Sequence, residues 1–236
     1  MILDFTNVDL APPQTPRAGF GLVRGVHWSR IGTELGPDPK LAAAYARTIP
    51  ATYNTPLVVE CGPAESYLYG TAYDGTTRIR TLPYLRAMAD TIDAMRQVNA
   101  NLTISIFHTV QCTENAARFP HEAKWGDALR EADDAIRRNI PTDFGVHNLY
   151  ISKGGEPAIE SIVALSAEMA RGRGTRTYGI LCPYWIDTDP RVSVGATARG
   201  RMLQAMKNQR MTAISWSDQP AMLAALTPVD RTYAGV

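Results

Sequence analysis

The feature that most constrains the fold is an alternation of two kinds of segment along the chain. Short β-branched or aromatic runs alternate with longer segments whose apolar residues recur every three or four positions. Consecutive strands joined by helices must run parallel, through right-handed crossovers. Strands are predicted over 21–28, 56–60, 102–110, 145–152, 177–185 and 211–217, and residues 1–5 offer a seventh.

The segments between these strands carry helix signals at their ends. Asp38 precedes Pro39 in the arrangement of an N-cap and a first helical turn, and Thr81 precedes Pro83 in a similar way. The fourth helical segment begins with acidic residues and ends with arginines and glycines, as the helix dipole favours. Helices are predicted over 38–49, 81–100, 125–140, 156–174 and 193–209.

A closed (β/α) barrel and an open doubly wound sheet both satisfy this pattern. The phosphate-binding glycine motifs that often follow the first strand of an open sheet are missing, which favours the barrel and predicts no cofactor. Six or seven strands are fewer than the eight of a full barrel. The sequence therefore predicts one α/β domain over 1–236, with a TIM-barrel-like fold reduced in strand number.

One stretch interrupts the alternation of strands and helices. In residues 66–80, three tyrosines alternate with small residues around an Asp-Gly pair, which is typical of a β-hairpin. The stretch follows the second predicted strand, so we expect a hairpin insertion on the face where a barrel carries its functional loops.

Composition excludes several classes of partner. The formal net charge is +1, which gives no field to hold nucleic acid. No apolar run approaches the ~20 residues of a membrane span, and no export signal precedes the first strand, so we expect a soluble protein without membrane contact. The three cysteines form no CxxC pair and the histidines show no HxH or HxxxH spacing, so no metal site is predicted. The compartment and the oligomeric state are not indicated.

Polar and aromatic side chains collect where the predicted strands end. In parallel β/α folds the functional site forms at the carboxyl ends of the strands. Aromatic faces combined with carboxylates and histidines suit sugars, whose rings have apolar faces and a rim of hydroxyl groups. The residues at these ends are His27, Trp28, Glu60, His108, Tyr150, Tyr184, Trp185, Trp216 and Asp218, with Tyr69 in the predicted hairpin.

Two short motifs resemble a known family. The segment TPLVVECG resembles the strand that delivers the nucleophilic glutamate in (β/α)8-barrel glycoside hydrolases of the cellulase-like superfamily, and AISWSD resembles their final strand. The resemblance implies that Glu60 is the nucleophile and that Trp216 forms the floor of the sugar site. This sequence departs from the family because Glu60 lies on an early strand and no Asn-Glu pair precedes it.

The second catalytic carboxylate therefore cannot be taken from the family. The candidates by position are Glu114, Asp187, Asp189 and Asp218. Carboxyl groups about 5–5.5 Å apart would retain the anomeric configuration, and groups about 6.5–9.5 Å apart would invert it.

Three functions are compatible with these residues. The favoured one is hydrolysis of an oligosaccharide or polysaccharide, with Glu60 as nucleophile or general base and one of Asp187, Glu114 and Asp218 as general acid. The aromatic residues and histidines at the strand ends would then bind substrate: Trp28, Trp185, Trp216, His27, His108, Tyr184 and Tyr69. The alternatives are a non-catalytic carbohydrate-binding or structural barrel, and a metal-dependent hydrolase or lyase that uses His27, His108 and Asp187.

Overall fold

Within the residues that the computed structural model describes, parallel strands form one seven-stranded sheet, and β3 (Gly32–Thr33) pairs with β4 (Gly36–Pro37) beside it. The strands are β1 (Ile2–Asn7), β2 (Phe20–Val26), β5 (Leu57–Glu60), β6 (Ile104–Phe107), β7 (Gly145–Leu149), β8 (Thr177–Leu181) and β9 (Thr212–Trp216). The described residues are 2–7, 20–33, 36–53, 55–60, 75–107, 111–149, 151–174, 176–182, 185, 187–188 and 192–216.

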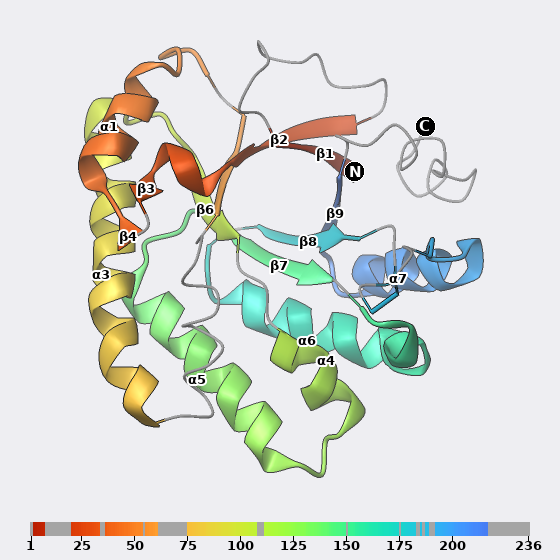
Figure 1. The fold of residues 1–236 in the computed structure, drawn as a ribbon. Coiled ribbons are helices and arrows are strands. Elements are labelled where there is room, and N and C mark those ends of the chain that lie inside the picture. Colours follow the sequence, from red (N-terminus) through yellow and green to blue (C-terminus); the bar gives the residue numbers. More distant parts are fainter. Residues whose placement is uncertain are drawn as a thin grey trace.

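The order of the strands is that of a barrel opened along one line. It runs β6-β5-β2-β1-β9-β8-β7, so strands of the large sheet that are consecutive in the chain are paired, except for β6 and β7, and the first strand pairs with the last. Figure 1 shows the strands following one another around a ring, with helices outside them. The described parts of the edge strands β6 and β7 share no ladder. The reduced, barrel-like sheet expected from the sequence is therefore present, and residues 2–7 supply its seventh strand.

Side chains and loop atoms join the two edge strands at their amino ends. The Asp143 backbone N–H donates to the Ile104 carbonyl at 2.9 Å, and the Asp143 carboxylate accepts from the Ile104 N–H at 2.7 Å. The buried Ser105 hydroxyl donates to the Phe144 carbonyl at 2.6 Å. Arg96 also donates to the Asp143 carboxylate, at 2.8 Å. We call these contacts of Asp143 and Ser105 the seam.

The helices cover the outer face of this sheet. Asp38 caps the first of them by accepting from the backbone N–H groups of Lys40 and Leu41 at 2.8 and 3.4 Å, as its place before a proline predicts. The described helices are α1 (Pro39–Arg47), α3 (Gly75–Val98), α4 (Gln111–Arg118), α5 (Ala123–Asn139), α6 (Ile159–Arg171) and α7 (Ala196–Asn208), with 3₁₀ turns η1 (Trp28–Arg30) and η3 (Lys153–Ala158). Among them, no helix is long and apolar enough to cross a membrane.

Alternation along the strands divides the core into an interior cluster and two outer clusters. One outer cluster joins β5 and β6 to α1 and α3, and the other joins β7, β8 and β9 to α6 and α7. The interior cluster contains Val23, Val58, Phe144, Val146, Tyr178 and Ile180. The aromatic rings of Phe144 and Tyr178 meet edge to face there, with centroids 5.0 Å apart.

The hairpin prediction for 66–80 is wrong over its last six residues, because α3 begins at Gly75 and continues through Pro83. The Asp-Gly pair that suggests a tight turn also places an aspartate directly before a helix, where it is a favoured cap. Thr81 therefore does not begin the helix. Residues 66–74, including Tyr69, lie outside the described residues.

We expect the Asp143→Ala substitution to lower the free energy of unfolding by about 1–3 kcal/mol, because the Ile104 N–H and the Arg96 guanidinium lose their acceptor. Urea denaturation measures this change. The control is Asp127→Ala, because the Asp127 side chain is 75% exposed and lies 3.7 Å from Arg130. That control should change stability by less than about 1 kcal/mol. Equal effects of both substitutions would show that the seam does not hold the sheet.

Candidate active site

The carboxyl edge of the sheet brings Glu60 beside two neighbouring strands. Glu60 is the last residue of β5 and pairs with Phe107 of β6. On its other side, the register of β2 and β5 matches Val26 with Val59, so the next position along β2, His27, lies level with Glu60. Neighbouring strands lie about 4.8 Å apart. The fold therefore places two of the predicted site residues at the same level: Glu60 ends β5, and His27 directly follows the adjacent strand β2.

His27 is half-buried where β2 leads into η1. Its Nδ1 lies 2.9 Å from the Ser29 hydroxyl and 3.3 Å from the Ser29 backbone N–H. These contacts fix the orientation of the imidazole ring at the edge of the sheet. Trp28, the next residue, is the first residue of η1.

Glu114 lies in the first turn of α4, the helix that follows β6, and it is 8% exposed. One of its oxygens accepts from the Ser152 backbone N–H at 2.8 Å. The other accepts from Arg118 at 2.9 Å and from the Ser152 hydroxyl. A Cβ atom on Gly155 would lie 2.6 Å from Glu114 Oε1, so glycine is required there for the close approach. Both carboxylate oxygens of Glu114 are thus engaged by the loop after β7 and by its own helix.

Asp187 reaches the same loop from the segment after β8. Its Oδ1 accepts from the Lys153 backbone N–H at 2.7 Å, while its side chain remains exposed. Glu114 and Asp187 therefore bind the consecutive N–H groups of Ser152 and Lys153. The structure brings these two predicted acids to one loop at the carboxyl edge of the sheet.

Trp185 lies at the start of the segment that carries Asp187. It is 5% exposed and packs in the outer cluster with α6 and α7. Its backbone N–H donates to the Val192 carbonyl at 3.0 Å, and its carbonyl accepts from the Thr188 hydroxyl at 3.0 Å. Trp185 therefore anchors this loop and offers little ring surface to a ligand.

The remaining predicted residues divide into two groups. Trp216 is the last residue of β9 and pairs with Phe5 of β1, so it lies at the carboxyl edge. The others lie outside the described residues: His108, Tyr69, Tyr150, Tyr184, Asp189 and Asp218. The metal hypothesis needs His108, so it stays a prediction. Among the described residues, no group of three or more His, Cys, Asp or Glu side chains is placed to hold a metal ion.

Sequence reasoning missed Ser152 and Arg118, the two partners of Glu114. For each of them, a feature of the sequence could have indicated its role. Ser152 precedes the turn η3 and caps it through its hydroxyl, and serine is a favoured residue at such a position. Glu114 and Arg118 are four residues apart, the spacing at which opposite charges pair on a helix. Because residues 111–118 were not predicted to form a helix, the ion pair between Glu114 and Arg118 could not be predicted from this spacing.

Comparison with known proteins adds to the description of the fold. The crystal structure of bee venom hyaluronidase matches with a TM-score of 0.56 and 10% identity, over 90% of this chain and 84% of that chain. A protein from Bacteroides thetaiotaomicron, provisionally described as an alpha-L-fucosidase, matches with a TM-score of 0.55 and 11% identity, over 99% and 95%. No protein family model and no curated protein matches the sequence. At these identities the similarity concerns the fold.

We expect the Glu114→Ala substitution to lower the free energy of unfolding by about 2–4 kcal/mol, because it leaves the Ser152 N–H and the Arg118 guanidinium without a shared acceptor. The control is Glu160→Ala. Glu160 is 56% exposed on α6, and hydrogen bonds from Arg201 lower the pKa of its carboxyl group. Its loss should change stability by less than about 1 kcal/mol. Chemical denaturation of both variants tests the difference, and a Glu114 effect as small as the control would contradict the structural role.

Proposed function

We propose that the chain is a glycoside hydrolase whose catalytic carboxylates lie at the carboxyl edge of the sheet. The observation that carries this proposal is the position of Glu60, which ends β5 level with His27 on the neighbouring strand. The fold supports it, because similar structures carry the names hyaluronidase and alpha-L-fucosidase. Parallel β/α folds form their sites at this edge.

Glu60 is the proposed nucleophile or general base. Val58, two residues earlier on β5, belongs to the interior cluster. Because alternate residues of a strand share one face, we expect position 60 to share the interior face at the mouth of the sheet. A carboxylate at this position would face the sugar ring from the inside of the barrel. His27 would lie beside it as a hydrogen-bonding partner for a sugar hydroxyl group.

Asp187 is the proposed general acid. Among the described candidates, Glu114 has both oxygens occupied, by Arg118 and Ser152. Asp187 is exposed and uses Oδ1 for Lys153. A general acid must reach the glycosidic oxygen, and the exposed Asp187 carboxyl group is more accessible to a sugar than that of Glu114, which is 8% exposed.

The chemistry follows the paired-carboxylate scheme for glycosides. The general acid gives its proton to the glycosidic oxygen as the bond between that oxygen and the anomeric carbon breaks. Glu60 then either attacks the anomeric carbon or removes a proton from the attacking water, depending on the separation of the two carboxyl groups. Trp28 and Trp216 at the same edge are the proposed aromatic surfaces for the sugar ring.

A non-catalytic carbohydrate-binding or structural barrel is the second candidate function. The observation that favours it is that both described candidate acids, Glu114 and Asp187, accept hydrogen bonds from backbone N–H groups of one loop. Carboxylates with such partners fix the position of a loop. In this alternative the same edge binds sugar and leaves the glycosidic bond intact.

We expect the Glu60→Gln substitution to lower the rate of glycan hydrolysis by at least about 100-fold, because glutamine can neither attack as a carboxylate nor accept a proton. Release of reducing ends from a panel of polysaccharides and oligosaccharides, with hyaluronan and alpha-L-fucosides included, measures this rate. The matched control is Glu168→Gln, an exposed position on α6. That control should retain full activity.

Two outcomes separate the candidates. Full activity of the Glu60→Gln variant would remove Glu60 from the mechanism. Sugar binding without hydrolysis by the unsubstituted protein, measured by calorimetry on the same panel, would favour the non-catalytic barrel.

A further inference from the structure

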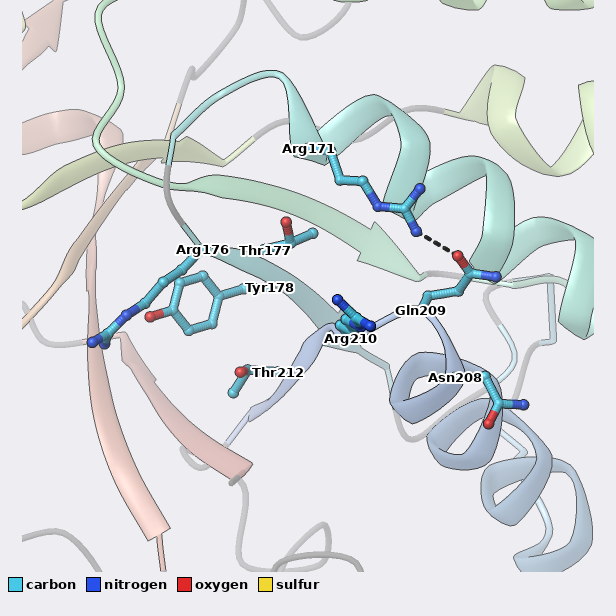
Figure 2. A pocket seen from close by; sticks show the side chains of 8 residues that line it. All are labelled: Arg171, Arg176, Thr177, Tyr178, Asn208, Gln209, Arg210 and Thr212. Carbon is cyan, nitrogen blue, oxygen red and sulfur yellow. Dashed lines mark hydrogen bonds between the residues drawn. The ribbon is translucent and has the colours of Figure 1, made fainter.

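The two ends of the sheet differ in how their polar side chains are arranged. At the amino ends of β8 and β9, a pocket of about 680 Å³ has Arg171, Arg176 and Arg210 in its lining. Figure 2 shows that Arg171 is bonded to Gln209. The Arg176 side chain extends past the Tyr178 ring, away from the other two arginines (Figure 2), so the three do not surround one ligand. At the carboxyl edge, in contrast, two carboxylates bind one short loop.

Ser152, in the loop after β7, has each of its polar groups bonded. Its backbone N–H donates to one oxygen of Glu114 at 2.8 Å, and its hydroxyl group donates to the other oxygen. Its carbonyl accepts from the Gly155 N–H at 2.9 Å, and the same N–H lies 3.1 Å from the Ser152 hydroxyl oxygen. These contacts with Glu114 and Gly155 fix the orientation of Ser152.

The orientation of Ser152 determines where the next backbone N–H points. The Ser152 carbonyl and the Lys153 N–H belong to one planar peptide group, so the direction of the first sets the direction of the second. The Lys153 N–H donates to Asp187 Oδ1 at 2.7 Å. A continuous set of bonds therefore runs from the Glu114 carboxylate, through Ser152 and one peptide group, to the Asp187 carboxyl group.

The two carboxyl groups at the ends of this set differ in how firmly they are held. Glu114 is 8% exposed, lies on α4 and accepts from Arg118 at 2.9 Å. The loop packs directly on it, because a Cβ atom on Gly155 would lie 2.6 Å from Glu114 Oε1. Asp187 is exposed, and within the described parts of the chain its side chain bonds only to the Lys153 N–H. Glu114 is therefore the fixed end, and Asp187 is the end that needs to be oriented.

We propose that Glu114 is a positioning residue for Asp187, acting through Ser152 and the Lys153 N–H. The catalytic consequence rests on the proposed function, in which Asp187 gives its proton to the glycosidic oxygen as the bond to the anomeric carbon breaks. Because the Lys153 N–H occupies Oδ1, Oδ2 is the oxygen that carries this proton. A misplacement of about 1 Å can cost about 100-fold in rate. Glu114 thus sets the rate of proton transfer without contacting the substrate.

Amide hydrogen exchange at the Lys153 N–H, followed by NMR on the whole chain, tests the positioning without a substrate. We expect Glu114→Gln to speed this exchange at least about tenfold, because the peptide group loses its fixed orientation. Ser152→Ala removes the hydroxyl contact with Glu114 and should act in the same direction, which keeps the test decisive if Glu114→Gln does not fold.

The matched control is Asp143→Asn. Asp143 also accepts from a backbone N–H and from an arginine, but it does so at the amino ends of β6 and β7. This substitution should lower stability in a comparable way and leave the exchange at Lys153 unchanged.

Kinetics tests the consequence for the proposed general acid. A sugar leaving group needs a proton from the acid, whereas a dinitrophenolate leaves without one. The substrates are the oligosaccharide that the glycan panel identifies and the dinitrophenyl glycoside of the same sugar. We expect Glu114→Gln and Asp187→Asn each to lower kcat/KM at least about tenfold more for the oligosaccharide. The double variant should be no slower on it than Asp187→Asn alone, because both substitutions affect one group.

Four results separate the possibilities. Unchanged exchange at Lys153 in the Glu114→Gln and Ser152→Ala variants overturns the proposal, whatever their activity. Equal losses of kcat/KM for both substrates in Glu114→Gln, the result expected of Asp143→Asn, also overturn it. So does an effect of Glu114→Gln that adds in full to that of Asp187→Asn. If the unsubstituted chain hydrolyses no glycan, the proposed function fails, and the exchange at Lys153 alone decides whether Glu114 positions Asp187.

Discussion

The line between β6 and β7 is the constraint on which the candidate site depends. The strands on either side of it share no ladder in the described residues, so side chains hold their relative position. Asp143 does this at the amino ends by accepting from the Ile104 N–H. Glu114 does it at the carboxyl ends, because it follows β6 and accepts from the Ser152 N–H after β7. The carboxylates of Asp143 and Glu114 thus supply contacts between β6 and β7, where a closed barrel has a ladder of backbone hydrogen bonds.

The position of the proposed acid pair follows from these two contacts. Glu60 lies on the β6 side of the line, and Asp187 lies on the β7 side, where it holds the Lys153 N–H beside Ser152. Their separation is therefore set by how closely the two edges approach, and Glu114 fixes that approach at the level of the site. A buried carboxylate can in this way be essential for activity while it takes no part in the chemistry.

The sequence allowed the strands to be predicted because each is a short apolar run, and the observed β5 and β9 lie within the predicted ranges 56–60 and 211–217. The seam could not be predicted, since it joins residues 39 positions apart through side chain to backbone contacts. Helix α4 was missed because it has only eight residues, and two alanines and one cysteine are too few apolar side chains for a helical period to be recognised. For the site, the sequence predicts which residues lie where the strands end. The partners of Glu114 can be identified only from the fold.

The repeating β/α unit also explains where several basic residues lie along the chain. Each described helix carries a basic residue in its last turn, namely Arg47, Arg96, Arg118, Arg138, Arg171 and Lys207. The helix dipole favours this arrangement, so a basic residue at a helix end needs no functional explanation. Arg210 differs because it lies beyond the helix in a backbone conformation that disfavours its side chain. Glu60 differs because it is the last residue of a strand. Local rules of helix capping and helix dipole thus leave Arg210 and Glu60 unexplained, and these two residues lie at opposite ends of the sheet.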